Sequence, residues 1–257
     1  MRGNPKVNAL FVAEVFNTRN GLIPYEGDEI PDDDSGTPEE RAFRYWINSL
    51  GLDDCFINNL YLDLSDGVAL LKVCDHIKPG CVDWKKVVKK EKMTKFDHQG
   101  NCDYAFDVCE NTIGKKCVGV GGVNILNVDK KGILAITWQL CRVHYLQLLD
   151  NKSEPEIMAW ANSVVEGMEI TSFGDKQLRT SHYLLKVIAS INPGYVNWEL
   201  VNDGIEEDDA KDNAKYMLGL CKKLGAVIFA AWEHVAKSDK KMMLILICSL
   251  YDIAHRN

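Results

Sequence analysis

Hydrophobic residues follow a helical spacing in two stretches of the chain that lie 114 positions apart. In the first stretch, the apolar residues at positions i, i+3, i+4 and i+7 are Phe43, Trp46, Ile47 and Leu50. Residues 157–164 repeat this spacing, which places apolar side chains on one face of an α-helix. Thr37 and Ser153 each precede a glutamate by three residues, the pattern of a helix-capping box. Both stretches therefore predict an amphipathic helix with a defined start.

Other parts of the pattern are duplicated as well. Residues 77–84 read IKPGCVDW, and residues 191–198 read INPGYVNW. Asp129 and Asp239 each precede two lysines and then a run that is apolar on nearly all sides. A period this long exceeds a solenoid unit and fits a duplicated domain. No run alternates with period two, so the fold class is all-α, with four main helices in each domain.

The remaining helices can be placed from the same cues. We expect a second helix over roughly residues 64–76 and again over 181–190, each ended by Pro-Gly. A third helix contains Asn101 in the first copy and Asn213 in the second. The last helix of each copy begins after Asp129 or Asp239 as the N-cap.

These elements divide the chain into three parts. Residues 1–36 comprise an N-terminal helical segment and an acidic linker, residues 37–150 a first domain, and residues 151–257 a second domain. Within the first part, residues 4–20 carry apolar positions close to helical spacing, and the stretch from 24 onward is rich in proline, glycine and acids. We expect this linker to be extended.

Composition narrows the class of protein. Hydrophobic residues make up 46% of the chain, the net charge is −7 and the pI is about 5.4, which argues against a broad basic surface for nucleic acid. Nine cysteines without a CxxC pair are read as reduced thiols, and five of them fall in apolar helical patterns. These are Cys74, Cys109, Cys141, Cys221 and Cys248. No signal peptide or membrane span is apparent, so we expect a cytoplasmic protein without membrane insertion.

The chain offers no reaction centre. Its six histidines form no HExxH pair, and there is no GxSxG elbow. The spacing of His98, Cys102 and Cys109 fits no zinc pattern, and residues 119–122 are read as a turn before the last helix rather than a phosphate loop. The six tryptophans mostly recur at equivalent positions and are expected in the core. We therefore expect a non-enzymatic monomer without cofactor or metal.

One segment is strongly basic. Residues 85–95 contain six lysines and one acid. Such a run is a solvated loop in one interpretation. In the other, it attracts an acidic polymer, which an acidic protein can approach only through local positive patches.

Several segments resemble a known family. DLSDGVALLKVCDHI (residues 63–77) and RAFRYWINSLG (residues 41–51) resemble the central and first helices of a calponin-homology domain. NPKVNALFVAEVFN (residues 4–17) and VGVGGVNILN (residues 118–127) make the chain similar to the second actin-binding half of the fimbrin, or plastin, family. The resemblance implies two tandem calponin-homology domains that bind actin filaments as part of a cross-linking protein of the actin cytoskeleton.

The resemblance also implies where the filament contacts lie. They fall on the first helix of the first domain (41–50), on its last helix (130–147), and on the first helix of the second domain (154–165). With the apolar stripes assigned to the core, the expected outward contact residues are Arg41, Arg44, Tyr45, Asn48, Lys130, Lys131, Gln139 and Arg142. The two domains are further expected to pack together and to separate for full binding.

The chain departs from whole fimbrins in having one domain pair and no calcium-binding loop, because the acidic run at residues 28–34 lacks the EF-hand spacing. One pair alone is expected to bind filaments without bundling them, unless it dimerises. The alternative function is a calponin-homology pair that binds another partner, such as microtubules or a signalling protein.

Overall fold

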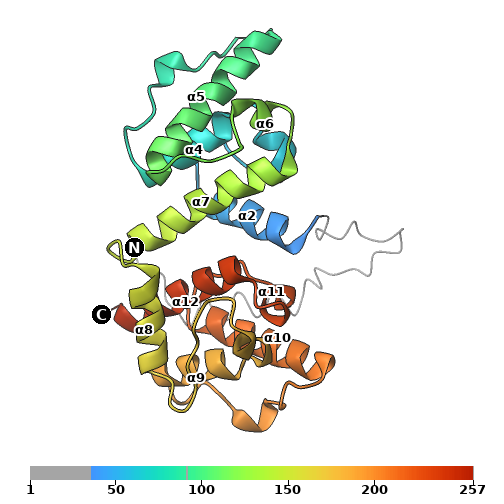
Figure 1. Cartoon of the computed structure of the whole chain (residues 1–257), viewed down its shortest axis with the longest axis vertical. Coiled ribbons are helices and arrows are strands. Elements are labelled where there is room, and N and C mark those ends of the chain that lie inside the picture. The colour runs from blue at the N-terminus through green and yellow to red at the C-terminus, as the bar shows by residue number, and fades with distance from the viewer. Residues whose placement is uncertain (1–35, 91, 257) are drawn as a thin grey trace, which may run out of the picture. The chain divides into compact units, whose positions relative to one another are not determined.

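The computed structural model describes residues 36–90 and 92–256, and these residues form helices joined by loops, with no strand among them (Figure 1). The all-α expectation is confirmed. The expectations for the N-terminal helical segment and for the linker up to residue 35 lie outside the described residues.

The first repeat contains four main helices and three short ones. In chain order its elements are α2 (Pro38–Ser49), α3 (Leu60–Asp63), α4 (Val68–Ile77), η1 (Trp84–Lys86), α5 (Lys95–Ile113), α6 (Gly122–Leu126) and α7 (Lys130–Leu148). Helix α5 packs against α4, α6 and α7, and α7 also packs against α2. The four long helices thus enclose one core.

The second repeat has the same order of elements. They are α8 (Glu154–Ser163), η2 (Lys176–Thr180), α9 (His182–Ile191), η3 (Trp198–Leu200), α10 (Glu207–Lys223), α11 (Trp232–Ala236) and α12 (Lys240–His255). Every residue from Met242 to Leu250 in α12 is buried, as expected for a helix that is apolar on nearly all sides.

The predicted helix starts are confirmed at the level of single hydrogen bonds. The Thr37 hydroxyl accepts from the Glu40 amide at 3.2 Å, and Ser153 forms a reciprocal capping box with Glu156. The carboxylates of Asp129 and Asp239 accept from the backbone amides of α7 and α12. Each cap satisfies a backbone donor that has no partner within its helix.

The second helix of the first repeat begins later than expected, at Val68 rather than near residue 64. Gly67 adopts a φ of +77°, and a Cβ there would lie 3.0 Å from the Asn101 carbonyl oxygen of α5. The chain therefore turns at Gly67 in order to pass close to α5, and residues 60–63 form the separate helix α3.

The turn expected at residues 119–122 contains an additional element. Helix α6 begins at Gly122, where a Cβ would lie within 2.6 Å of Asp103 in α5. Glycine permits this close approach. The expectation of a simple turn missed α6 because the helix depends on a contact distant in sequence.

The core contains the thiols that were expected there. All nine cysteines are free, and the five named above are buried. Burial raises the pKa of thiols such as Cys141 and Cys221, which keeps them protonated and unreactive. The expectation for the tryptophans is met by four of the six, because Trp46 is fully buried and Trp138, Trp160 and Trp232 pack, partly buried, against the core. Trp84 and Trp198 depart from it, since they are 38% and 46% exposed.

Asparagine side chains brace equivalent loops in both repeats. Asn48 donates to the Ile57 carbonyl and accepts from the Ile57 amide, and Asn162 holds Ile170 in the same way. Pairing both backbone groups of one residue fixes the loop after the first helix to that helix. The duplication thus extends from sequence to individual hydrogen bonds.

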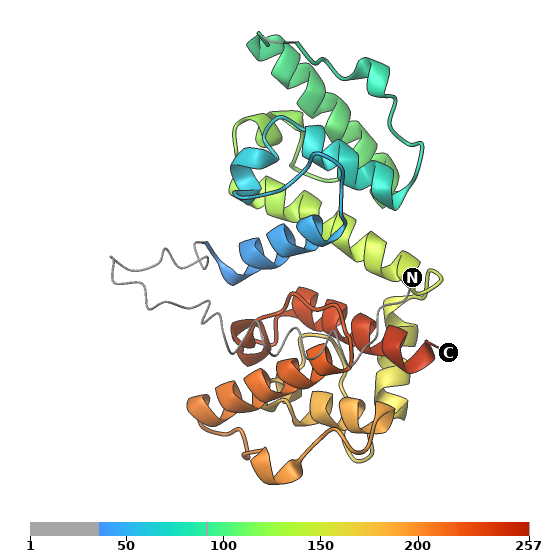
Figure 2. The ribbon, with the colours of Figure 1, turned by 180° about the vertical axis from the view of Figure 1, so that it is seen from behind.

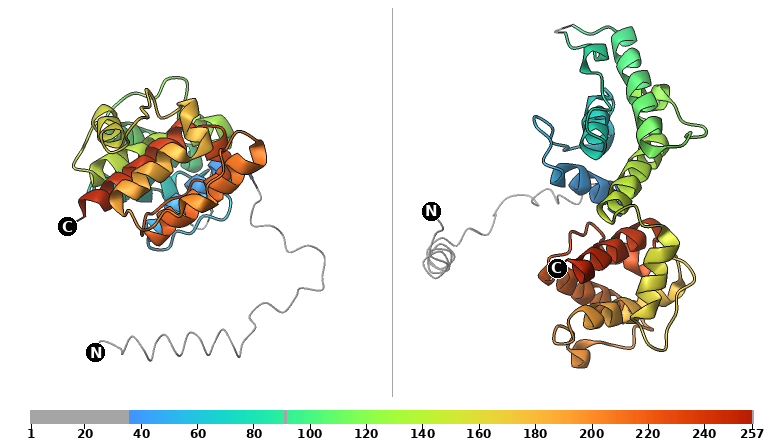
Figure 3. Two further views of the ribbon diagram at one scale, coloured as in Figure 1. Left: turned by 90° about the horizontal axis from the view of Figure 1, so that it is seen from below. Right: turned by 90° about the vertical axis from the view of Figure 1, so that its left-hand side faces the viewer.

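The two repeats contact each other, since residues from Gly36 onward form one compact unit. Helix α7 of the first repeat packs against α12 of the second, and α12 packs against α8. Figures 2 and 3 show α7 and α12 from behind and from two further directions.

Candidate functional site

Helices α2, α7 and α8 contain the residues expected to contact a partner, and only part of each helix is exposed. The side chains exposed on them are Tyr45, Ser49, Lys130, Lys131, Ala135, Gln147, Leu148, Pro155, Glu156, Ala159 and Ser163. Of the eight residues predicted to point outward, Tyr45, Lys130 and Lys131 are exposed. The ammonium of Lys130 lies 4.9 Å from the centre of the Tyr61 ring. A contact with an aromatic ring does not neutralise a lysine, so the positive charge of Lys130 remains at the surface.

Arg44 and Asn48 do not point outward as expected. Arg44 is 8% exposed and donates to the Asn58 carbonyl oxygen at 3.0 Å, and Asn48 is occupied by Ile57. The loop after α2 folds back over this face of the helix. The helical spacing of apolar residues predicted that Arg44 and Asn48 are exposed, because this spacing does not show where the following loop runs.

Arg41 and its neighbour Glu39 meet the second repeat. The Arg41 guanidinium lies 3.8 Å from Glu233 of α11, and its side chain is 13% exposed. The Glu39 carboxylate lies 2.6 Å from the ammonium of Lys241 in α12, which in turn lies 5.9 Å from the centre of the Trp138 ring. Charged groups on α2 are thus engaged within the molecule.

Two further predicted residues on α7 are partly enclosed. Arg142 donates to Glu154 of α8 at 2.5 Å, and its side chain is 31% exposed. Gln139 is half-buried, and its Oε1 has no hydrogen-bond partner among the described residues. Both lie on the helix that carries Lys130, but Arg142 is paired with Glu154 and the Gln139 oxygen is buried, so neither presents its polar end to solvent.

A cavity of about 240 Å³ lies where the repeats meet. The first repeat contributes Trp46, His144 and Leu148 to its wall, and the second contributes Val227 and Phe229. Next to it, the Tyr145 hydroxyl donates to the Val227 carbonyl oxygen at 3.2 Å. The junction is therefore partly hollow and not fully packed.

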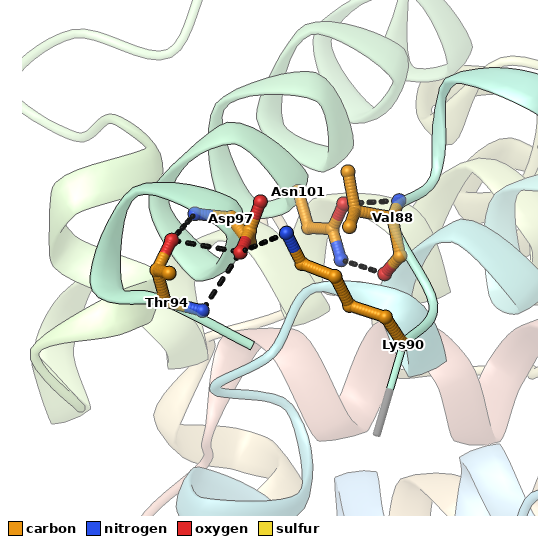
Figure 4. A network of polar contacts seen from close by, with 5 residues as sticks. All are labelled: Val88, Lys90, Thr94, Asp97 and Asn101. Atoms are coloured by element: carbon orange, nitrogen blue, oxygen red, sulfur yellow. Dashed lines mark hydrogen bonds and ion pairs between the residues drawn. The ribbon is translucent and has the colours of Figure 1, made fainter. Parts of the chain in front are cut away.

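The basic segment lies outside this junction and runs from η1 to the first residue of α5, and all six of its lysines are exposed. Figure 4 shows how the segment is held. The Asn101 side chain pairs with both backbone groups of Val88, while Thr94 and Asp97 form the capping box of α5. The lysines on either side of residue 91 therefore project from backbone that these contacts hold in place.

One lysine of this segment is partly neutralised. The Lys90 ammonium lies 2.8 Å from Asp97. This contact, together with the hydrogen bonds from Thr94, lowers the pKa of Asp97 to about 2. The other five lysines are not in ion pairs with described residues, so the segment remains positive.

The junction residues were missed by sequence reasoning. Lys241 and Glu39 are 202 positions apart, and no short-range pattern links them. His144 also lines the junction, although the sequence pattern does not distinguish it from the other histidines. Its position next to Tyr145, which is buried in the structure, is the one feature that could have indicated it. Leu148, at the end of α7, is 60% exposed and therefore does not belong to the buried apolar stripe of that helix.

No group of three or more potential metal-ligating side chains occurs within residues 36–90 and 92–256. Within the same residues, no helix has the length and apolarity needed to cross a membrane.

The calponin homology (CH) domain family matches residues 37–146 and again residues 151–256. The chain belongs to the calponin homology family. Its two repeats are CH domains, and the junction described above lies between the first and the second CH domain.

Relatives of the whole chain are fimbrins and plastins, which confirms the resemblance. Fimbrin of Schizosaccharomyces pombe is 36% identical over 267 residues, covering 96% of this chain and 43% of the relative. Plastin-3 of Bos taurus is 33% identical over 267 residues, covering 96% and 42%. The crystal structure of the actin-crosslinking core of S. pombe fimbrin matches with a TM-score of 0.76 and 36% identity, covering 96% of this chain and 53% of that one. The chain thus spans less than half the length of these two relatives.

Proposed function

We propose that the two CH domains form the actin-filament-binding module of a fimbrin-like cross-linking protein of the cytoplasmic actin cytoskeleton. The observation that carries this proposal is the similarity, over 96% of the chain, to the actin-crosslinking core of a fimbrin. The alternative of a microtubule-binding pair has no support from the relatives reported above, which are named fimbrin and plastin. The module acts by binding and performs no catalysis.

The filament-binding surface that we propose has two parts. The first comprises Tyr45 of α2 with Lys130 and Lys131 of α7, which are exposed while the domains are together. The second is the basic segment, whose six exposed lysines offer a positive patch on a protein of net charge −7. Actin filaments are acidic, so both parts would steer the module toward them.

The junction limits access to the rest of the surface. Arg41 of α2 is held by Glu233 of the second domain. Separation of the domains would release this arginine and uncover the adjoining parts of α2 and α7. We therefore propose that the closed pair binds filaments weakly and the separated pair binds them more tightly.

High-speed co-pelleting with filamentous actin tests the function. The wild-type protein is expected to pellet in a saturable manner, and Lys130→Glu/Lys131→Glu is expected to weaken binding at least tenfold. Lys222→Glu/Lys223→Glu, which reverses two exposed lysines on α10, is the matched control and should pellet as the wild type does. At low speed, the single pair should bind filaments without bundling them.

Three results would contradict the proposal. The first is the absence of saturable pelleting by a protein that is folded according to circular dichroism. The second is equal weakening by both charge reversals, which would indicate nonspecific attraction. The third is saturable pelleting with tubulin polymers in place of actin, which would favour the microtubule alternative.

A further inference from the structure

His144 lies where the two CH domains meet. It belongs to α7 of the first domain, and it lines the cavity that Val227 and Phe229 of the second domain close from the other side. Its neighbour Tyr145 donates to the Val227 carbonyl oxygen. This wall of the His144 environment is therefore present only while the domains are together.

The hydrogen bond that His144 makes requires a neutral ring. The Trp46 indole nitrogen donates to Nδ1 of His144 at 3.2 Å. An indole N–H can only donate, so Nδ1 must carry a lone pair and the single ring proton must lie on Nε2. A second proton would have to bind at Nδ1, where it would face the indole hydrogen and break the bond.

The groups around His144 do not compensate for a positive charge. From α4, the His76 ring lies 5.8 Å away and is itself a potential cation. From α12, across the cavity, the Asp252 carboxylate is already paired with Arg256. Helix α2 contributes Trp46 and Ser49, and α7 contributes Tyr145, none of which is charged at neutral pH. Burial, followed by the influence of His76, lowers the pKa of His144 to about 4.

We propose that His144 is a proton-sensitive latch between the CH domains: the pair closes around a neutral His144, and protonation of its ring drives the domains apart. Only the consequence for filament binding rests on the proposed function, because closure can be measured without actin.

The direction of the effect follows from linkage. In the separated pair, Trp46 and His76 stay beside His144, but water replaces the wall that the second domain supplies, so the pKa of His144 rises toward its ordinary value of about 6.5. Its pKa is depressed in the closed pair, so closure is fully favoured above about pH 6.5 and is lost progressively as the pH falls toward 4. Between pH 7.5 and pH 5.5, the closed-to-open equilibrium constant should fall by at most about tenfold, the value for a fully restored pKa in the separated pair.

Small-angle X-ray scattering at pH 7.5 and pH 5.5 tests the latch. The wild-type protein is expected to expand at the lower pH. In His144→Asn the amide oxygen takes the place of Nδ1 and accepts from Trp46, but it does not titrate, so this variant should stay compact at both values. His98→Asn, which removes a histidine of α5 outside the junction, is the matched control and should expand as the wild type does.

Equal expansion of wild type and His144→Asn would overturn the proposal, and so would a wild type that stays compact at pH 5.5. Should the variant fail to fold, NMR titration of His144 in the wild type decides: protonation of the ring that coincides with the expansion supports the latch, and expansion while the ring is still neutral refutes it. Co-pelleting with actin at pH 6.0 and 7.5 separates the two proposals. Expansion at low pH without a gain in filament binding would support the latch and contradict the role assigned to closure in binding.

Discussion

Lys241, in the first turn of α12, lies 2.6 Å from Glu39, in the first turn of α2. This ion pair joins the second CH domain to the first, at a point where the same ammonium also lies 5.9 Å from the centre of the Trp138 ring. One side chain of the second domain thus contacts two helices of the first. These are the helices on which filament contacts are proposed, so closure and filament binding should compete.

Lys241→Glu should open the pair. The substitution removes the ion pair and the contact with Trp138 and places two carboxylates together. The side chains of Lys241 and Glu39 are 36% and 27% exposed, so solvent screens the pair and the total effect should be ~1–2 kcal/mol, or about 5- to 30-fold in the closed-to-open equilibrium. Scattering should show expansion, and co-pelleting should show tighter actin binding.

Two variants control for the effect of charge alone. Lys240→Glu changes the neighbouring exposed lysine and should leave both measurements unchanged, whereas the double exchange Glu39→Lys/Lys241→Glu should recover part of the closure. If Lys241→Glu expands the protein but leaves actin affinity at the wild-type value, closure does not control binding.

Short-range patterns predicted the helix starts, because a cap involves residues three positions apart. Thr37, Ser153, Asp129 and Asp239 are all confirmed as N-caps. The outward face of α2 could not be predicted in the same way, since Arg44 is covered by a loop whose path depends on tertiary contacts. The junction is harder still, because Lys241 and Glu39 meet only after both domains have folded.

Asn48→Ala should destabilise the first CH domain. Asn48 satisfies both the amide and the carbonyl of Ile57, at 2.7 and 2.9 Å, and Ile57 is buried. Losing both bonds should cost ~2–3 kcal/mol and lower the melting temperature by about 5–10 °C. Thermal unfolding followed by circular dichroism measures the change. Ser49→Ala removes an exposed hydroxyl bonded to the Trp46 carbonyl and should change stability by less than ~0.5 kcal/mol; equal losses would show that Asn48 does not brace the loop.

The carboxyl group of Asp97 should titrate unusually low. The contact with Lys90 and the hydrogen bonds from Thr94 hold its pKa at about 2. Because this pKa is depressed relative to the unfolded chain, its contribution to stability is present above about pH 4 and is lost as the pH falls through 2. Carbon-13 NMR of the carboxyl should give a midpoint near 2 in the wild type and a higher one in Lys90→Ala. Lys92→Ala, which removes another exposed lysine of the same segment, should keep the wild-type midpoint; a midpoint near 4 in the wild type would exclude the contact in solution.

Two glycines of the first CH domain should respond in opposite directions to the same substitution. A Cβ at Gly122 would lie 2.2 Å from the Asp103 side chain and 2.5 Å from its backbone nitrogen, whereas a Cβ at Gly100, within α5, meets nothing within 4 Å. Gly122→Ala should therefore force α6 away from α5 and destabilise the domain by ~1–3 kcal/mol. Gly100→Ala should stabilise it by ~0.5–1 kcal/mol, because alanine loses less backbone entropy in a helix. Urea unfolding of both variants measures the difference, and destabilisation by Gly100→Ala, or tolerance of Gly122→Ala, would mean that α6 does not pack against α5 as described.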